Sequence, residues 1–182
     1  RAELDAASAG LDALGYACAA DWLLHAQDTA AADALGTRFL RGAVYQDHRA
    51  GDAAVEVDYL DAAGVTQTLR AALVVGADGS ESALRAQLGI TVERYDYGQS
   101  AVIAPIEVEL PVAGTAFEHF TAEGPLALIP QGGTRYVSVQ CLEHARAEAA
   151  LAAGDTAYAA MLERRFGTRL GSIRVCGARR AH

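Results

Sequence analysis

Gly76, Asp78 and Gly79 stand together between an apolar run, residues 73–75, and a segment with helical spacing. The run contains two β-branched valines, which favours a strand buried on both faces. The three residues that follow it favour a tight turn. A strand, a turn and a helix start in this order suit ligand binding, because the first amides of a helix lack partners and attract anions. Glycines at the turn let a ligand approach the backbone.

Asp78 decides which part of a ligand such a turn would contact. Because a carboxylate repels a phosphate, we expect Asp78 to accept hydrogen bonds from sugar hydroxyls, directly or through water. Arg85 would supply positive charge nearby, and Ser80 is the expected N-cap of a helix that ends at Gly89. The same residues also suit an ordinary strand-to-helix connection, with Asp78 in an Asx-turn and Arg85 in solvent. Spacing alone leaves both interpretations open.

The string from residue 73 to residue 90 resembles the Asp-Gly fingerprint of the FAD-dependent aromatic hydroxylases, the flavoprotein monooxygenases of the p-hydroxybenzoate hydroxylase type. The matching residues are Gly76, Ala77, Asp78, Gly79, Ser82, Arg85, Leu88, Gly89 and Ile90. A match of this length is more specific than a pair of glycines. The resemblance implies FAD as cofactor and NAD(P)H as co-substrate. The cofactor contacts that it implies come from Gly76, Asp78, Gly79, Ser82 and Arg85.

Composition limits the classes of protein that the chain can belong to. With 182 residues and 52% apolar side chains, it fits a globular protein of one domain or a compact pair. The formal charge of −8 counts against nucleic-acid binding. The three cysteines are widely spaced and the five histidines scattered, so we expect no disulfide framework and no metal site, as in a reducing cytoplasm. No apolar run approaches the roughly 20 residues that span a bilayer.

The first half of the chain is predicted to hold a helix and a small antiparallel ribbon. The predicted elements are a loop at 1–15, a strand at 16–18, a helix at 21–34, and strands at 38–46, 55–59 and 66–70. Asp21 is the expected N-cap of the helix, with Leu23 and Leu24 on its inner face and Trp22 as a packing residue.

The second half is predicted to be a strand-rich segment followed by helices. The predicted strands lie at 100–110, 115–121, 125–130, 134–142 and 172–178, and the predicted helices at 144–153 and 155–167. Consecutive strands with short turns indicate an antiparallel sheet. Pro105 lacks an amide donor, so its strand is predicted to be an edge or to carry a bulge. In the last helix Tyr158, Met161, Leu162 and Phe166 share one face and belong to the core.

Residues 97–142 resemble one branch of the same family, the ubiquinone-biosynthesis hydroxylases of the 2-polyprenyl-6-methoxyphenol hydroxylase type. The matching strings are residues 97–101, 116–121 and 124–130. The resemblance implies an α+β fold in two parts: the central part of a flavin-binding α/β domain at 1–90, and an antiparallel or mixed substrate-domain sheet with helices at 91–182. Phe117, His119, Pro125 and Leu126 would then line the substrate pocket, and no residue is assigned a catalytic role.

The implied activity is hydroxylation of a polyprenylated phenol in ubiquinone synthesis, with NAD(P)H reducing FAD and O₂ supplying the oxygen atom. The sequence departs from the family because it lacks the N-terminal Gly-x-Gly-x-x-Gly motif and the downstream Gly-Asp motif. We therefore expect an internal piece of a longer hydroxylase that alone binds FAD weakly or not at all and is inactive. We expect a cytoplasmic location, with peripheral membrane contact or contact with a ubiquinone-synthesis complex left open.

Two alternatives stay open. The first is a non-catalytic α+β module whose apolar sheet binds a quinone-like lipid or a partner protein. The second is a hydroxylase or halogenase that acts on a soluble aromatic compound, because the shape of the pocket decides the substrate.

Overall fold

The computed structural model describes residues 2–32 and 36–182. The chain divides into two compact units, Arg1–His25 with Asp96–His182 and Ala26–Tyr95. Each unit has a sheet in which every strand pair is antiparallel, together with helices. The predicted α+β class is therefore confirmed. The assignment of residues 1–90 and 91–182 to a flavin-binding and a substrate domain stays a prediction.

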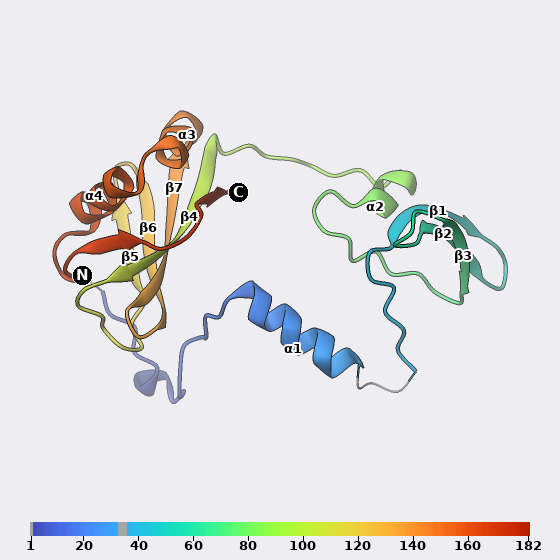
Figure 1. Cartoon of the computed structure of the whole chain (residues 1–182), viewed down its shortest axis with the longest axis horizontal. Coiled ribbons are helices and arrows are strands. Elements are labelled where there is room, and N and C mark those ends of the chain that lie inside the picture. Colours follow the sequence, from blue (N-terminus) through green and yellow to red (C-terminus); the bar gives the residue numbers. More distant parts are fainter. Residues whose placement is uncertain (1, 33–35) are drawn as a thin grey trace. The chain divides into compact units, whose positions relative to one another are not determined.

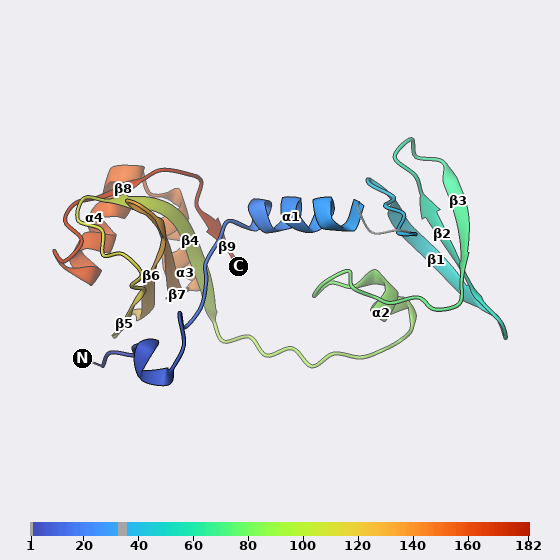
Figure 2. The same cartoon turned by 90° about the horizontal axis from the view of Figure 1, so that it is seen from below.

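The unit Ala26–Tyr95 is built on a three-stranded meander (Figure 2). Its strands are β1 (Val44–Ala50), β2 (Val55–Leu60) and β3 (Thr66–Ala71), in the order β1-β2-β3. The predicted ribbon is confirmed, although β1 begins later than expected. The turn between β2 and β3 closes on Asp61, whose Oδ1 accepts from the amides of Ala63 and Val65 at 3.0 and 2.9 Å. Those hydrogen bonds, the one from Val65 foremost, lower the pKa of Asp61.

The buried strand predicted at residues 73–75 is wrong. This segment has no strand structure, and the side chains of Leu73 and Val75 are 76% and 74% exposed. A strand buried on both faces needs neighbouring strands, whereas the described meander contains β1, β2 and β3 and gains no fourth strand from this run. The short helix predicted after the turn is present as α2 (Ala83–Gln87).

The N-terminal segment departs most from expectation. Residues 16–18 form no strand, and a short 3-10 helix, η1 (Ala7–Ala9), precedes them. Helix α1 (Ala20–Ala32) is present, but Asp21 lies in its first turn rather than at the N-cap, and Trp22 is 80% exposed. Leu23 and Leu24 are exposed as well. An apolar stripe is buried only where another element covers it, and no described residue of α1 is buried. The predicted helix end, Ala34, lies outside the described residues.

The unit formed by Arg1–His25 and Asp96–His182 contains a six-stranded sheet with two helices on one face (Figure 1). The strands are β4 (Gln99–Val108), β5 (Phe117–Thr121), β6 (Gly124–Gly132), β7 (Arg135–Glu143), β8 (Ile173–Val175) and β9 (Arg180–Ala181). Their order is β5-β6-β7-β4-β8, with β9 also paired to β4. The helices are α3 (His144–Ala152) and α4 (Asp155–Phe166). The predicted strands and helices of this half are confirmed, except that the strand predicted at 172–178 is only the three residues of β8, and that β9 was not predicted.

The core lies between the sheet and the two helices. Val102, Ala104 and Ile106 alternate along β4 and are fully buried, and Tyr158 and Leu162 of α4 cover them. The predicted inner face of α4 is confirmed, with Phe166 buried and Met161 packed against the same cluster. Leu110, the last residue of the strand predicted at 100–110, is exposed because β4 ends at Val108.

Pro105 does not mark an edge strand, because β4 has β7 on one side and β8 and β9 on the other. The predicted alternative, a bulge, agrees with the register, because Ile106 pairs with Val175 whereas Ile103 pairs with Arg180, which leaves two extra residues beside Pro105. The Pro105 carbonyl accepts from the Cys176 amide at 3.0 Å, just beyond β8. The N and C=O of a strand residue point to the same side, so the missing donor faces the interval between β8 and β9. Gly177 passes close by, where an added Cβ would lie 2.8 Å from Pro105 Cγ. The two short strands therefore accommodate the proline within the sheet.

Within residues 2–32 and 36–182, every helix falls short of the length and apolarity that a bilayer crossing requires.

Candidate functional site

The Asp-Gly motif forms a turn that the Asp78 carboxylate holds closed. Its Oδ1 accepts from the Ser82 hydroxyl at 2.5 Å, and its Oδ2 accepts from the amides of Ala83 and Leu84 at 2.8 and 3.3 Å. Ser82 Oγ in turn accepts from the Arg85 amide at 3.0 Å. Ser82 is therefore the N-cap of α2, and the prediction of Ser80 is wrong because the helix begins only at residue 83.

These contacts fix the charge and the free bonding capacity of the site. The hydrogen bond from Ser82, helped by the backbone amides, lowers the pKa of Asp78, so the side chain is a carboxylate at neutral pH. The first three amides of α2 already have acceptors within the turn and do not offer themselves to a phosphate. Two carboxylate oxygens carry about four acceptor sites, so Asp78 keeps capacity for one further donor. The chemistry suits a ligand hydroxyl better than a ligand phosphate.

The other predicted cofactor residues lie in the same turn. Gly79 has φ +87°, and no described atom lies within 4 Å of an added Cβ, so the backbone is open there. Gly76 packs on Leu84, and a Cβ added at Gly76 would lie 3.0 Å from Leu84 Cδ2. The Arg85 guanidinium donates to the Ser80 carbonyl and closes the turn from the other side. The structure thus brings Gly76, Asp78, Gly79, Ser82 and Arg85 together, while their contact with a cofactor stays a prediction.

Gln87 fixes this turn to the meander, a role that sequence analysis missed. Its Nε2 donates to the Gln46 carbonyl of β1 at 2.7 Å, and its Oε1 accepts from the Tyr45 hydroxyl. The Tyr45 hydroxyl also lies 2.8 Å from His48 Nδ1. Gln87 is about forty residues away in sequence from Tyr45 and Gln46, and no periodicity connects them.

The four residues predicted for a substrate pocket lie on opposite faces of the six-stranded sheet. Residues directly opposite in an antiparallel pair share a face. His119 lies opposite Leu126, on the face covered by helices, while Pro125 lies opposite Phe120 on the other face. Phe117 shares the face of His119 and packs edge-on against Phe166 of α4, with ring centroids 5.4 Å apart.

His119 stacks on the same Phe166 ring at 4.8 Å, and Leu126 is fully buried in the core. Both residues, with Phe117, therefore contribute to packing between the sheet and α4. Phe120, by contrast, is 86% exposed. The structure does not gather the predicted four residues around one cavity, and their role in substrate binding stays a prediction.

The face without helices, which we call the open face, is apolar across three neighbouring strands. Its half-buried residues include Ile103, Ala127, Ile129, Val137 and Val139. Phe120 and Pro125 extend this face onto β5 and the start of β6. Sequence analysis did not single out this face, although apolar residues on both faces of β6 and β7 indicate a sheet that is covered on both sides.

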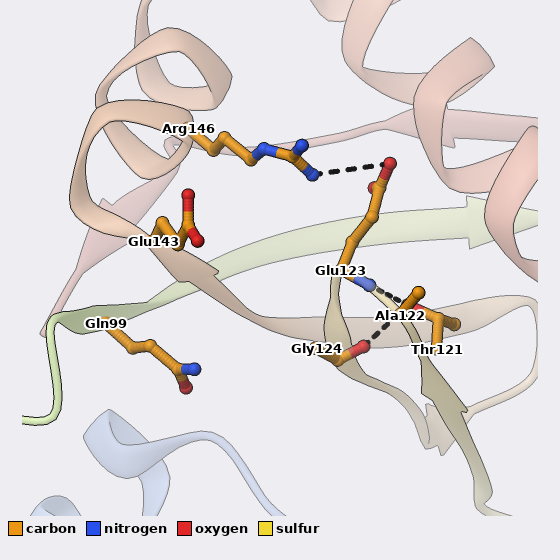
Figure 3. A pocket seen from close by; sticks show the side chains of 7 residues that line it. All are labelled: Gln99, Thr121, Ala122, Glu123, Gly124, Glu143 and Arg146. Atoms are coloured by element: carbon orange, nitrogen blue, oxygen red, sulfur yellow. Dashed lines mark hydrogen bonds and ion pairs between the residues drawn. The ribbon is translucent and has the colours of Figure 1, made fainter.

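A small pocket of about 260 Å³ lies at the end of this sheet, beside the turn between β5 and β6 (Figure 3). Its lining residues are Gln99, Thr121, Ala122, Glu123, Gly124, Glu143 and Arg146. Arg146 reaches across it to Glu123, with 3.4 Å between NH1 and Oε1. This polar lining does not suit an apolar aromatic ring. Over the part of the chain that the structure describes, no group of three or more His, Cys, Asp or Glu residues is arranged to hold a metal ion.

Comparison with known proteins decides the family. A family model described as an FAD binding domain matches residues 25–182. The chain belongs to the FAD-binding domain family. The family predicted from the Asp-Gly string is thereby confirmed, and the matched residues include both the Asp78 turn and the six-stranded sheet.

The curated relatives of this FAD-binding domain chain include a ubiquinone hydroxylase and a 3-demethoxyubiquinol 3-hydroxylase. It is 42% identical over 113 residues to "Ubiquinone hydroxylase UbiL" of Rhodospirillum rubrum, a match that covers 62% of the chain and 26% of that relative. It is 36% identical over 64 residues to "3-demethoxyubiquinol 3-hydroxylase" of Escherichia coli, covering 35% of the chain and 16% of the relative. The chain thus spans about a quarter or less of the length of these relatives.

Solved structures share the fold at low sequence identity. A flavoprotein/dehydrogenase from Cytophaga hutchinsonii matches with a TM-score of 0.62 at 13% identity, covering 77% of this chain and 36% of that one. OxyS anhydrotetracycline hydroxylase from Streptomyces rimosus matches with a TM-score of 0.56 at 20% identity, covering 89% of this chain and 33% of that one. Both matches support the α+β architecture described above.

Proposed function

We propose that the chain is part of an FAD-dependent monooxygenase that hydroxylates a polyprenylated phenol in ubiquinone biosynthesis, with NAD(P)H as reductant. The observation that carries the proposal is the 42% identity to a ubiquinone hydroxylase over 113 residues, within an FAD-binding domain match of residues 25–182. Bound FAD would supply the redox and oxygen-transfer chemistry. The protein would then bind, orient and shield the reactants, which agrees with a site that needs no side-chain nucleophile or paired carboxylates.

The Asp78 turn would hold a hydroxyl-bearing part of FAD. Asp78 has a free acceptor site and a charge fixed by Ser82, and Gly79 leaves the backbone open to a ligand. Arg85 would add positive charge toward the pyrophosphate. The supporting observation is that the first amides of α2 already donate to Asp78. The carboxylate is therefore the main group of the turn that could form a hydrogen bond with a ligand.

The open face of the six-stranded sheet would cover the flavin ring and the aromatic substrate. Apolar side chains from β4, β6 and β7 offer a surface that suits a phenol ring and a prenyl chain and excludes water. Phe120 and Pro125 would lie at its rim. A polyprenyl substrate resides in membranes, so we also propose peripheral contact of the whole protein with the membrane surface.

The test is the visible absorbance spectrum of a protein spanning the length of its relatives, purified beside the 182-residue chain. A yellow long protein and a colourless 182-residue chain are the expected result, and they would support both flavin binding and the proposal that this chain alone does not retain FAD. A colourless long protein that fails to take up added FAD would contradict the proposal. The non-catalytic binding module would then become the better account.

Substrate class needs a separate measurement. NAD(P)H oxidation coupled to product formation is compared for prenylated phenols and for soluble phenols of the same ring pattern. Faster turnover of the prenylated series is expected. A preference for the soluble series would favour the alternative of a hydroxylase for a soluble aromatic compound.

A further inference from the structure

Arg165 of α4 is a buried cation that reaches the turn between β5 and β6. Its side chain is 8% exposed. One terminal nitrogen donates to Thr121 Oγ1 at 3.0 Å and to the Gly124 carbonyl at 2.9 Å, and the other donates to the side-chain carbonyl of Gln140. A single side chain thus contacts both ends of the two-residue turn and the neighbouring strand β7.

The charge of Arg165 is balanced at the same turn. Among the described residues its Nε–H has no hydrogen-bond acceptor, and the Glu123 carboxylate oxygen lies 3.6 Å away. A buried guanidinium is costly unless it is paired, and an apolar side chain of similar volume would fill the same space at lower cost. The arrangement therefore favours a role in fixing the turn over a role in general stability.

The fixed turn carries two residues of the open face. Phe120 immediately precedes Thr121, Pro125 immediately follows Gly124, and the two form a register pair on the face opposite to Arg165. The Thr121 hydroxyl also donates to the Gly124 carbonyl at 2.7 Å and accepts from the Glu123 amide at 3.2 Å. Any shift of the turn that Arg165 holds would move the exposed Phe120 ring.

We propose that Arg165 is a positioning residue that fixes the β5–β6 hairpin, and so sets the place of Phe120 and Pro125 against the aromatic substrate. The inference rests on the proposed function, in which the open face lines the substrate site. It assigns a specificity role to a residue that does not itself touch the substrate.

The experiment compares Arg165→Met with Arg164→Met in the full-length, FAD-loaded protein. Arg164 is the adjacent, exposed residue of the same helix, so it controls for the loss of one positive charge. We expect Arg165→Met to raise KM for a prenylated phenol about tenfold while kcat stays within about twofold, because uniform binding is lost. Hydrogen exchange should quicken at residues 121–124 and stay unchanged in β4 and β7. Arg164→Met should match the wild type in both measurements.

A second pair of variants covers the case in which Arg165→Met does not fold. Thr121→Val removes the hydroxyl that Arg165 contacts, whereas Thr121→Ser keeps it. Only Thr121→Val should raise KM. An unchanged KM in both Arg165→Met and Thr121→Val, or a loosening of the whole sheet, would overturn the inference and leave the proposed function intact. A wild-type protein that turns over no phenol would overturn the proposed function and this inference with it.

Discussion

The Asp78 carboxylate accepts a 2.5 Å hydrogen bond from the Ser82 hydroxyl, and Ser82 caps the helix that follows. The two side chains connect the glycine turn to α2 without help from other elements. The side chain predicted to contact the cofactor is therefore also the one that shapes the turn. Substitutions at these positions should change local stability as well as flavin binding.

Loss of the cap should destabilise α2. Ser82→Ala removes the acceptor for the Arg85 amide, at an expected cost of about 1 kcal/mol in the opening free energy of α2. Ser80→Ala should change that free energy by less than about 0.5 kcal/mol, because Ser80 contacts Arg85 through its main-chain carbonyl. Native-state hydrogen exchange at Ala86 and Leu88, whose amides donate to the carbonyls of Ser82 and Leu84, measures the difference. Equal effects of the two substitutions would contradict the assignment of the cap.

The Asp78 contacts should also be visible in its titration. The hydrogen bond from Ser82 lowers the pKa of Asp78 from its ordinary value of 3.8. The contribution of the carboxylate to the turn is therefore complete above pH 3.8 and is lost as the pH falls through the lowered folded pKa. A carboxyl-carbon NMR titration should give a midpoint below 3.8 in the wild type and a higher midpoint in Ser82→Ala. The same midpoint in both proteins would argue against this hydrogen bond.

Gly124 should tolerate no side chain. Its φ is +114°, and an added Cβ would lie 2.2 Å from the Cys141 carbonyl oxygen. Gly124→Ala should cost more than about 4 kcal/mol in unfolding free energy, because a steric clash adds to backbone strain. Gly133→Ala is the matched control, since Gly133 has φ +56° and no described atom within 4 Å of a Cβ. Its cost should be about 1–2 kcal/mol, from the left-handed conformation alone. Urea denaturation of both variants, with the wild type as reference, decides the comparison.

Substitutions of Phe117 and Phe120 should distinguish a residue that packs the core from a residue that binds the substrate. Phe117 packs on Phe166 beneath α4, so Phe117→Ala should lower the thermal midpoint and leave KM close to the wild-type value. Phe120 is exposed on the open face, so Phe120→Ala should keep the thermal midpoint and raise KM for a prenylated phenol severalfold. The reverse pattern would place the substrate on the helix-covered side of the sheet.

Much of the segment Asp96–His182 was predictable from the sequence because its strands carry local signals. Alternating apolar residues on β4, short turns around Gly124 and Gly132, and the apolar face of α4 each act over a few residues. The way in which the sheet accommodates Pro105 was not predictable. A proline excludes an amide donor, but only the pairing of β8 and β9 with β4 shows that the sheet leaves an interval there.

Helix α1 and residues 73–75 show the opposite case. Leu73 and Val75, like the leucines of α1, have the patterns of buried elements, yet their side chains are exposed. An apolar pattern indicates which surface of an element is suited to burial. Whether that surface is buried depends on neighbouring elements, and the described part of the chain places none against these residues.

The candidate site divides in the same way. The Asp-Gly turn could be predicted because its residues are close in sequence, although the helix cap is Ser82 and not the predicted Ser80. The contacts of Gln87 with β1 and of Arg165 with the β5–β6 turn join residues about forty positions apart, which only the tertiary fold reveals.

The central claim is that the protein of which this chain is part places an oxygen atom from O₂ onto a prenylated phenol with the help of FAD. The most direct measurement supplies ¹⁸O₂, NAD(P)H and the phenol to the full-length, FAD-loaded protein and determines the mass of the product. The proposal predicts a hydroxylated phenol that carries one ¹⁸O atom, formed only when the reductant is present. A product without ¹⁸O, or no hydroxylated product from a protein that has bound FAD, would contradict it.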